Sequence, residues 1–136
     1  MKENEAIRAV TKTFINRWKH LLSIKDWDVQ LRYTTLDADE LGCCGVEPHH
    51  KSAMIMVDIN QIKDKQELLE VIRHELMHIV HAHFNSYRQA VEKHLPPNVV
   101  TVSDEIFSIA AEDLVLKLEH LVNKLDINIK GRHDET

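Results

Sequence analysis

Two histidines four positions apart, with a glutamate directly after the first, form the segment of this chain best suited to chemistry. The segment is His74-Glu75-Leu76-Met77-His78, an HExxH pattern. In a helix, residues four apart lie one turn above each other on the same side, so both imidazoles can reach one metal ion. Neutral imidazole nitrogens bind Zn²⁺ at about 2.0–2.1 Å. We therefore predict that His74 and His78 are ligands of a zinc ion.

The residue between the histidines suggests the reaction. Glu75 follows His74 directly, so its carboxylate can reach a water molecule on the metal without being a ligand itself. From there it can act as a general base, and it can later return a proton to a leaving amine. A zinc ion lowers the pKa of such a water toward about 7 and polarises a scissile carbonyl group. We expect Glu75 to be the catalytic residue of a hydrolytic reaction.

The helix predicted around this motif, from residue 64 to about residue 83, has two distinct faces. At about 100° per residue, His74, His78 and His81 share one face. The apolar residues that cover the opposite face are Leu68, Leu69, Ile72, Leu76, Ile79 and Val80. This separation favours a metal site that faces a cleft over histidines placed by coincidence. We expect His81 to be a neighbour of the ligands rather than a ligand.

A third protein ligand is needed, because a catalytic zinc ion usually has three. The metzincin pattern would require Gly at position 81 and His at position 84, whereas the chain has His81 and Phe84. The ligand must then come from another element, and we look to a helix predicted from Ser103, as N-cap, to about residue 125. Its candidates are, in order, Asp104, Glu105 and Glu112, and His94 is a further one. The alternative for each acid is a carboxylate that offsets the helix dipole.

The remaining elements predict an α+β fold with an N-terminal helix over 3–23. Residues 27–35 alternate apolar and polar, which indicates a half-buried strand. Residues 41–46 and 53–59 flank a turn and predict a hairpin. Pro96-Pro97 must end any helix that continues from the HExxH segment, before the C-terminal helix begins. We predict one domain over 1–136, with a small mixed sheet.

Composition limits the class of protein. The chain has 136 residues, 43% of them hydrophobic, and a net charge of −5. The acidic balance argues against a nucleic-acid partner, whose binding surface is expected to be basic. No apolar run approaches the roughly 18–20 residues of a membrane span, and no secretory signal is recognisable. We expect a cytoplasmic protein, or one that is released without a Sec-type signal.

The cysteines, Cys43 and Cys44, are adjacent in the sequence. Neighbouring cysteines rarely form a disulfide, because the bond needs a wider separation of their Cα atoms. We interpret them as free thiols in a reducing compartment. If the hairpin overhangs the metal, a thiolate could bind zinc and inhibit the site. The alternative is that both are small residues packed near glycines.

The chain resembles the minimal single-domain zincin metallopeptidases, which are gluzincin-like or aspzincin-like proteins of phage and prokaryotic genomes. The resemblance rests on Val71-Ile72-Arg73-His74-Glu75-Leu76-Met77-His78-Ile79-Val80, and the order of the other elements matches as a layout. It implies a zinc peptidase fold in which an edge strand lines the cleft and pairs with an extended substrate. That strand would be 41–46 or 53–59. The gluzincin third ligand is a Glu in an Asn-Glu context, where this chain has Ser103-Asp104-Glu105.

The sequence therefore predicts a zinc-dependent peptidase that acts on a peptide or protein substrate through Glu75. Two alternatives stay open. One is a non-catalytic zincin-fold module that binds metal or peptide, although Glu75 is retained. The other is a regulatory peptidase of narrow specificity. The substrate and the oligomeric state are not encoded in any motif of the chain.

Overall fold

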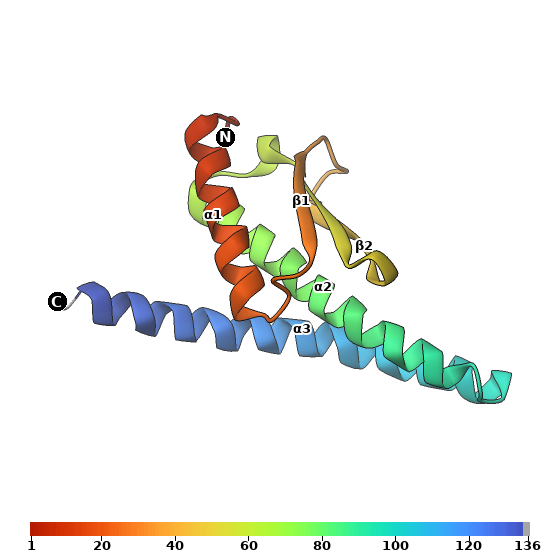
Figure 1. The fold of residues 1–136 in the computed structure, drawn as a ribbon. Helices are drawn as coiled ribbons and strands as arrows, with labels where there is room; N and C mark the ends of the chain where they lie inside the picture. Colours follow the sequence, from red (N-terminus) through yellow and green to blue (C-terminus); the bar gives the residue numbers. More distant parts are fainter. Residues whose placement is uncertain (135–136) are drawn as a thin grey trace. The chain divides into compact units, whose positions relative to one another are not determined.

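The computed structural model describes the backbone of residues 1–134 and leaves out the side chains at 84, 87, 114, 118, 121–123 and 125–134. Its main elements are α1 (Glu5–Leu21), β1 (Asp28–Tyr33), β2 (Gly42–Glu47), β3 (Ser52–Val57), α2 (Lys65–Glu92) and α3 (Pro97–Asp134) (Figure 1). Short 3-10 turns, η1 (Pro48–His50) and η2 (Ile59–Gln61), follow β2 and β3. The predicted α+β class is confirmed.

The chain forms two compact units, Met1–Tyr87 and Arg88–Thr136, which are described separately. The first contains α1, the sheet and most of α2. The second contains the end of α2 and all of α3. The candidate ligands His74 and His78 belong to the first unit, and Asp104 and Glu105 belong to the second.

The sheet is mixed and has three strands in the order β1-β3-β2. β3 pairs in parallel with β1 and antiparallel with β2. The predicted hairpin of β2 and β3 is therefore confirmed. The 53–59 region forms the central strand, so of the two strands proposed to lie at an edge only β2 does.

The helices of the first unit cover one face of the sheet. Tyr33 and Gly42 both lie opposite Val57 in the register, so the three residues share a face. On this face the Tyr33 hydroxyl lies 3.5 Å from Thr11 Oγ1 of α1. A Cβ atom added at Gly42 would lie 2.6 Å from Val71 Cγ1 of α2. Both helices therefore pack on the same side, and β3 is buried between them and its neighbouring strands.

The core of this unit follows the predicted apolar face of α2. Four of the six predicted residues are fully buried, namely Leu68, Ile72, Leu76 and Ile79. Ile55 and Val57 of β3 are also fully buried. Trp18 of α1 and Trp27, just before β1, are each 2% exposed. Burial of such side chains contributes roughly 1.5–3 kcal/mol each. The helix that carries the histidines is therefore anchored firmly by its opposite face.

Side-chain caps begin both α1 and α2. Asn4 Oδ1 accepts a hydrogen bond from the Ile7 amide at 2.9 Å, and Asp64 Oδ1 accepts one from the Glu67 amide at 2.9 Å. Each cap satisfies an amide that has no partner within its helix. Asp64 is thus the N-cap of α2.

The boundary between α2 and α3 differs from the prediction. α2 continues to Glu92 instead of ending near residue 83, because no Gly or Pro interrupts it before Pro96. α3 begins at Pro97, since a proline at the first helical position loses no hydrogen bond. The predicted N-cap, Ser103, lies inside α3, and its hydroxyl donates a hydrogen bond to Glu92 Oε1 at 2.7 Å. Asp104 and Glu105 are therefore not in the first turn of the helix.

Burial along α3 can be read only at its described side chains. Ala111 and Val115 are buried, whereas Ala110 is exposed. The side chains of Leu114, Leu118, Leu121 and Leu125 lie outside the described part of the structure.

Candidate functional site

The two histidines of the motif point at each other. His74 Nε2 and His78 Nε2 are 3.0 Å apart, and their ring centroids are 4.7 Å apart. Two nitrogens that bind one zinc ion at about 2.0–2.1 Å in tetrahedral geometry lie about 3.3 Å apart. The observed separation is close to this value, and both rings are half-buried on α2. The separation of the two nitrogens, which also allows a hydrogen bond between the rings, is therefore compatible with a shared metal ion.

The glutamate of the motif is directed toward the sheet. Glu75 is 6% exposed. A Cβ atom at Gly42 would lie 3.6 Å from Glu75 Cγ and 3.3 Å from the Met56 carbonyl oxygen, besides its close approach to Val71. Any side chain at position 42 would thus require Val71 or β2 to shift. The glycine lets the edge strand pass close to the carboxylate-bearing turn of the helix.

The outer edge of β2 lies beside this turn, and no strand among the described residues pairs with it. The Asp58 amide donates a hydrogen bond to the Leu41 carbonyl at 3.0 Å, so these two residues form a hydrogen-bonded pair. Such pairs recur at every second residue of an antiparallel ladder, so Cys43, Gly45 and Glu47 direct their N–H and C=O groups toward β3. Gly42, Cys44 and Val46 direct theirs outward. An extended peptide could pair with these three residues.

The two cysteines lie on opposite faces of β2. Cys44 pairs with the buried Ile55 and therefore faces the helices, while Cys43 pairs with Met56 and faces away. Burial, reinforced by the nearby charge of Glu75, raises the pKa of the Cys44 thiol to about 12. Burial also raises the pKa of the Cys43 thiol, with smaller contributions from Glu40 and Glu75. Both residues are free thiols, as predicted.

The other histidines of α2 have separate positions. His81 is half-buried on the helix. His83 packs edge-on against the Trp27 ring, with a centroid distance of 5.6 Å. His83 is half-buried, and α2 continues beyond it to Glu92.

The candidate third ligands lie on or just before α3. Asp104 Oδ1 forms an ion pair with Arg88 Nη1 at 3.0 Å, within the second unit. Arg88 also lies 3.8 Å from the centre of the Phe107 ring, which fixes the guanidinium in place. Glu105 and Glu112 are exposed on α3, and His94 is exposed between the helices. Within the described residues, no three His, Cys, Asp or Glu side chains form a group that could hold a metal ion. The third ligand stays a prediction.

Sequence patterns missed the relation between Gly42, Glu75 and the free edge of β2. The glycine itself was the available signal, because a glycine inside a strand often marks a close approach of another element. Gly45 carries the same signal without such a contact, since nothing lies within 4 Å of a Cβ atom placed there. The sequence alone could not distinguish the two glycines.

No protein-family model matches the chain, and no curated protein or solved structure is similar to it. Its fold and site therefore have to be interpreted from its own residues. None of the helices within the described residues combines the length and apolarity needed to cross a membrane. The cytoplasmic location stays a prediction.

Proposed function

We propose that the chain is a zinc-dependent peptidase of the minimal zincin type. The observation that carries the proposal is the convergence of His74 Nε2 and His78 Nε2, 3.0 Å apart, beside the buried Glu75. Imidazole nitrogens together with carboxylate oxygens are a donor set that suits zinc. Bound at this pair, zinc would polarise a substrate carbonyl group and lower the pKa of a water molecule toward about 7.

The remaining steps belong to residues of the chain. Glu75 accepts a proton from the attacking water and returns one to the amine that leaves. The free edge of β2 binds the substrate backbone in an extended form through Gly42, Cys44 and Val46. This pairing holds a scissile peptide bond alongside the turn that carries Glu75, which is the geometric requirement for the reaction.

Two measurements test this proposal. Zinc content by mass spectrometry is expected to be about one ion per chain in the native protein and in Glu75→Gln. It should fall to near background in His74→Ala and His78→Ala. His20→Ala, which removes an exposed histidine of α1, serves as the matched control and should keep its zinc. Equal zinc in the native protein and His78→Ala would exclude the site.

Turnover separates an enzyme from a binding module. A mixed peptide library is incubated with each variant, and its products are identified by mass spectrometry. Cleavage by the native protein and its loss in Glu75→Gln, with zinc retained, supports the peptidase. Zinc and peptide binding without cleavage by either protein would instead favour the non-catalytic module. Cleavage of only a few library members would indicate a regulatory peptidase of narrow specificity.

The third ligand is proposed to be Asp104 or Glu105. Asp104→Asn and Glu105→Gln keep the size of each side chain and remove its charge. The variant that lacks the true ligand should bind zinc about 10-fold or more weakly, as measured by competition with a chromophoric chelator. Glu112→Gln and His94→Ala complete the set of candidates. Unchanged zinc affinity in all four variants would show that the metal has no ligand among them.

A further inference from the structure

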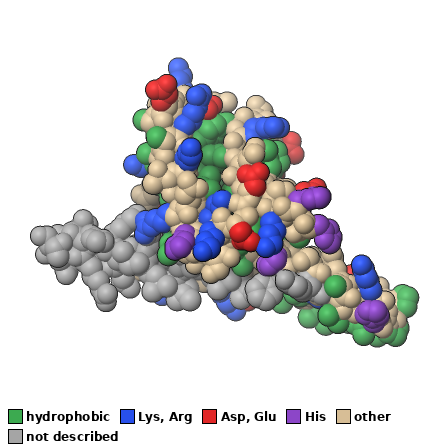
Figure 2. All heavy atoms as spheres, in the orientation of Figure 1, with side chains coloured by type: hydrophobic (Ala, Val, Ile, Leu, Met, Phe, Trp, Pro, Cys, Tyr) green, Lys and Arg blue, Asp and Glu red, His purple; other side chains and the backbone are tan. Residues whose placement is uncertain are grey.

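A groove lies between α1 and β1, at the sheet edge opposite β2. It has a volume of about 520 Å³. Ile15 of α1 and Val29 and Leu31 of β1 supply its apolar lining. Figure 2 shows the hollow between these two elements, with hydrophobic side chains at its base and Lys and Arg side chains along it. This groove takes no part in the proposed peptidase site.

The strand that borders the groove has a free backbone edge. The amide of Asp28 donates a hydrogen bond to the Lys51 carbonyl at 2.9 Å, and the amide of Thr34 donates one to the Val57 carbonyl at 3.0 Å. Backbone groups alternate in direction along a strand. The N–H and C=O groups of the even-numbered residues between Asp28 and Thr34 therefore also point toward β3. The N–H and C=O groups of Val29, Leu31 and Tyr33 therefore point away from β3. Among the described residues no strand pairs with them.

The charges around the groove are mainly positive. Three cations line it, Arg8, Lys12 and Arg32, against the single carboxylate of Glu3. Glu3 is paired with Arg8, whose Nε lies 2.6 Å from its Oε1. Lys12 and Arg32 are exposed and form no ion pair with a described residue. A chain with a net charge of −5 thus has a locally cationic groove.

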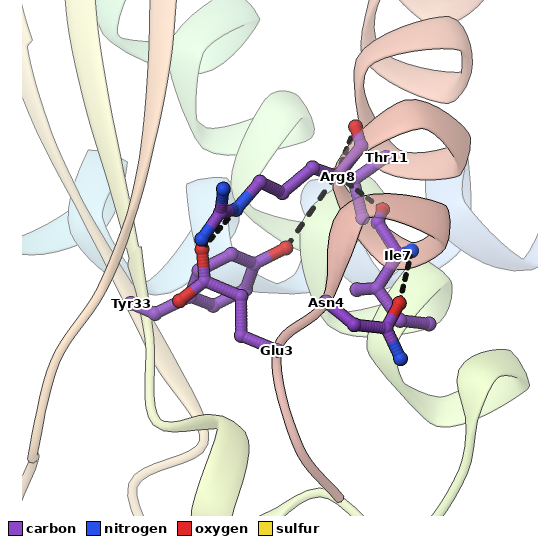
Figure 3. A network of polar contacts seen from close by, with 6 residues as sticks. All are labelled: Glu3, Asn4, Ile7, Arg8, Thr11 and Tyr33. Atoms are coloured by element: carbon purple, nitrogen blue, oxygen red, sulfur yellow. Dashed lines mark hydrogen bonds and ion pairs between the residues drawn. The ribbon is translucent and has the colours of Figure 1, made fainter.

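Polar contacts fix one end of the groove. Figure 3 shows Arg8 extending from α1 toward β1, where it meets Glu3 beside the ring of Tyr33. The Tyr33 hydroxyl lies 3.5 Å from Thr11 Oγ1, and Thr11 is itself held by a hydrogen bond to the Ile7 carbonyl at 2.9 Å. These contacts join α1 to the last residue of β1. The groove therefore lies between two elements that these contacts already join.

We propose that the β1 groove binds an extended acidic peptide segment of a partner protein, which adds to the sheet as a fourth strand beside β1. Backbone groups of the peptide would pair with Val29, Leu31 and Tyr33, as in other complexes formed by strand addition. Acidic side chains would meet Lys12 and Arg32, and apolar ones would contact Ile15 and Leu31. β1 has six residues, which at about 3.3 Å per residue accommodates a peptide segment of similar length.

The charge and the free edge together select this ligand. A nucleic acid would use the cations but would leave the backbone groups of β1 without partners. A neutral peptide would use the edge but would gain nothing from Lys12 and Arg32. The proposal does not depend on zinc or on Glu75, because the groove lies at the other edge of the sheet.

Fluorescence anisotropy with defined probes tests the charge requirement. The probe is a fluorescein-labelled ten-residue peptide that repeats Glu-Glu-Thr-Thr, which places Glu on both faces of the added strand, and its control has Gln in place of each Glu. The acidic probe should bind the native protein at least about 10-fold more tightly than the Gln control. Lys12→Glu/Arg32→Glu should weaken binding of the acidic probe by about the same factor. Lys25→Glu/Lys63→Glu, an equal change of charge at exposed residues that do not line the groove, should leave the binding unchanged.

Amide hydrogen exchange measured by NMR locates the bound peptide. Addition of the acidic probe should slow exchange at Val29, Leu31 and Tyr33, and leave exchange at Gly42, Cys44 and Val46 unchanged. Protection at β2 instead of β1 would overturn the proposal, as would equal binding of the Gln control. The peptide pair is informative even if a protein variant fails to fold. A single-stranded oligonucleotide that binds the groove as tightly as the acidic probe, without protection of the β1 amides, would identify a phosphate site instead.

Discussion

The two edges of the sheet offer the same backbone chemistry in different surroundings. Each exposes three residues with outward N–H and C=O groups, Val29, Leu31 and Tyr33 on β1 and Gly42, Cys44 and Val46 on β2. At β2 a glycine brings the strand against Glu75 of α2. At β1, larger residues and the cations of α1 frame an open groove. The chemistry available at an edge strand is therefore set by the helix beside it rather than by the strand itself.

The largest expected difference between the edges concerns Glu75. If the peptidase proposal is correct, Glu75→Gln should lower turnover by about 10²–10⁴, because a general base is lost. Binding of the acidic probe at the β1 groove should not change. Rates from the library assay and anisotropy on the same preparation check both statements. A parallel loss of turnover and probe binding would mean that the edges are not independent.

The cysteines give the next largest effect. At pH 8 in the metal-free protein, Cys44 should be alkylated by iodoacetamide on the order of 10³-fold more slowly than in the unfolded chain, because its pKa is raised from 9.0 to about 12. Cys43 should be slowed as well, since its pKa is also raised. Mass spectrometry of peptides that separate the two modifications measures both rates.

A second variant sharpens this prediction. Because the charge of Glu75 contributes to the raised pKa of Cys44, Glu75→Gln should speed alkylation of that thiol. The raised pKa also makes the fold lose stability as pH rises from about 9 toward about 12, where the unfolded chain releases the proton more readily. Alkylation of Cys44 at the unfolded rate would show that it does not face the helices.

The two glycines of β2 form a matched pair for stability. Gly42→Ala should cost about 1–3 kcal/mol, because its Cβ atom would overlap Val71 and crowd the Met56 carbonyl. Gly45→Ala has nothing within 4 Å of its Cβ atom and should be neutral or slightly stabilising. Urea unfolding of both variants gives the comparison. Val71→Ala combined with Gly42→Ala should recover part of the loss, and equal costs for the two glycine variants would disprove the close contact.

The smallest expected effect is on stability, and it involves Asp58, which holds the segment between β1 and β2 through Leu36. Asp58, at the end of β3, accepts hydrogen bonds from the Leu36 amide at 3.0 Å and the Gln61 side chain at 2.9 Å. These bonds lower the pKa of its carboxyl group below the ordinary value. The stabilisation is therefore present above about pH 4 and is lost as pH falls through the lowered pKa.

Asp58→Asn tests this link. The variant should be less stable than the native protein at pH 7, and the difference should shrink as the pH is lowered below about 4. Thermal unfolding of both proteins across this range measures it. Turnover and binding of the acidic probe should not change in this variant. The substitution affects the contacts of Asp58 with Leu36 and Gln61, and leaves the residues beside β1 and β2 unaltered. A difference in stability that does not change with pH would mean that the charge of Asp58 is not involved.

Local patterns in the sequence determined the helices and the side of α2 on which the histidines of the HExxH motif lie. Asn4 and Asp64 cap α1 and α2 by accepting hydrogen bonds from amides three residues away. These caps involve only neighbouring residues and do not depend on the rest of the fold. The separation of histidines from apolar residues on α2 is also local, since it depends on the helical period. The prediction failed at α3, where Pro97 begins the helix and Ser103, a good N-cap in type, bonds to Glu92 instead.

Tertiary structure alone decided the order of the strands and what lies beside each edge. The hairpin follows from neighbouring segments, but the parallel pairing of β1 with β3 joins residues 24 positions apart, such as Asp28 and Ser52. Whether a glycine meets a helix is likewise a long-range property, which distinguishes Gly42 from Gly45. The sequence determined by itself that His74, Glu75 and His78 share one helix. Only the fold placed Gly42 against that helix, because side-chain packing between distant segments has no period in the sequence.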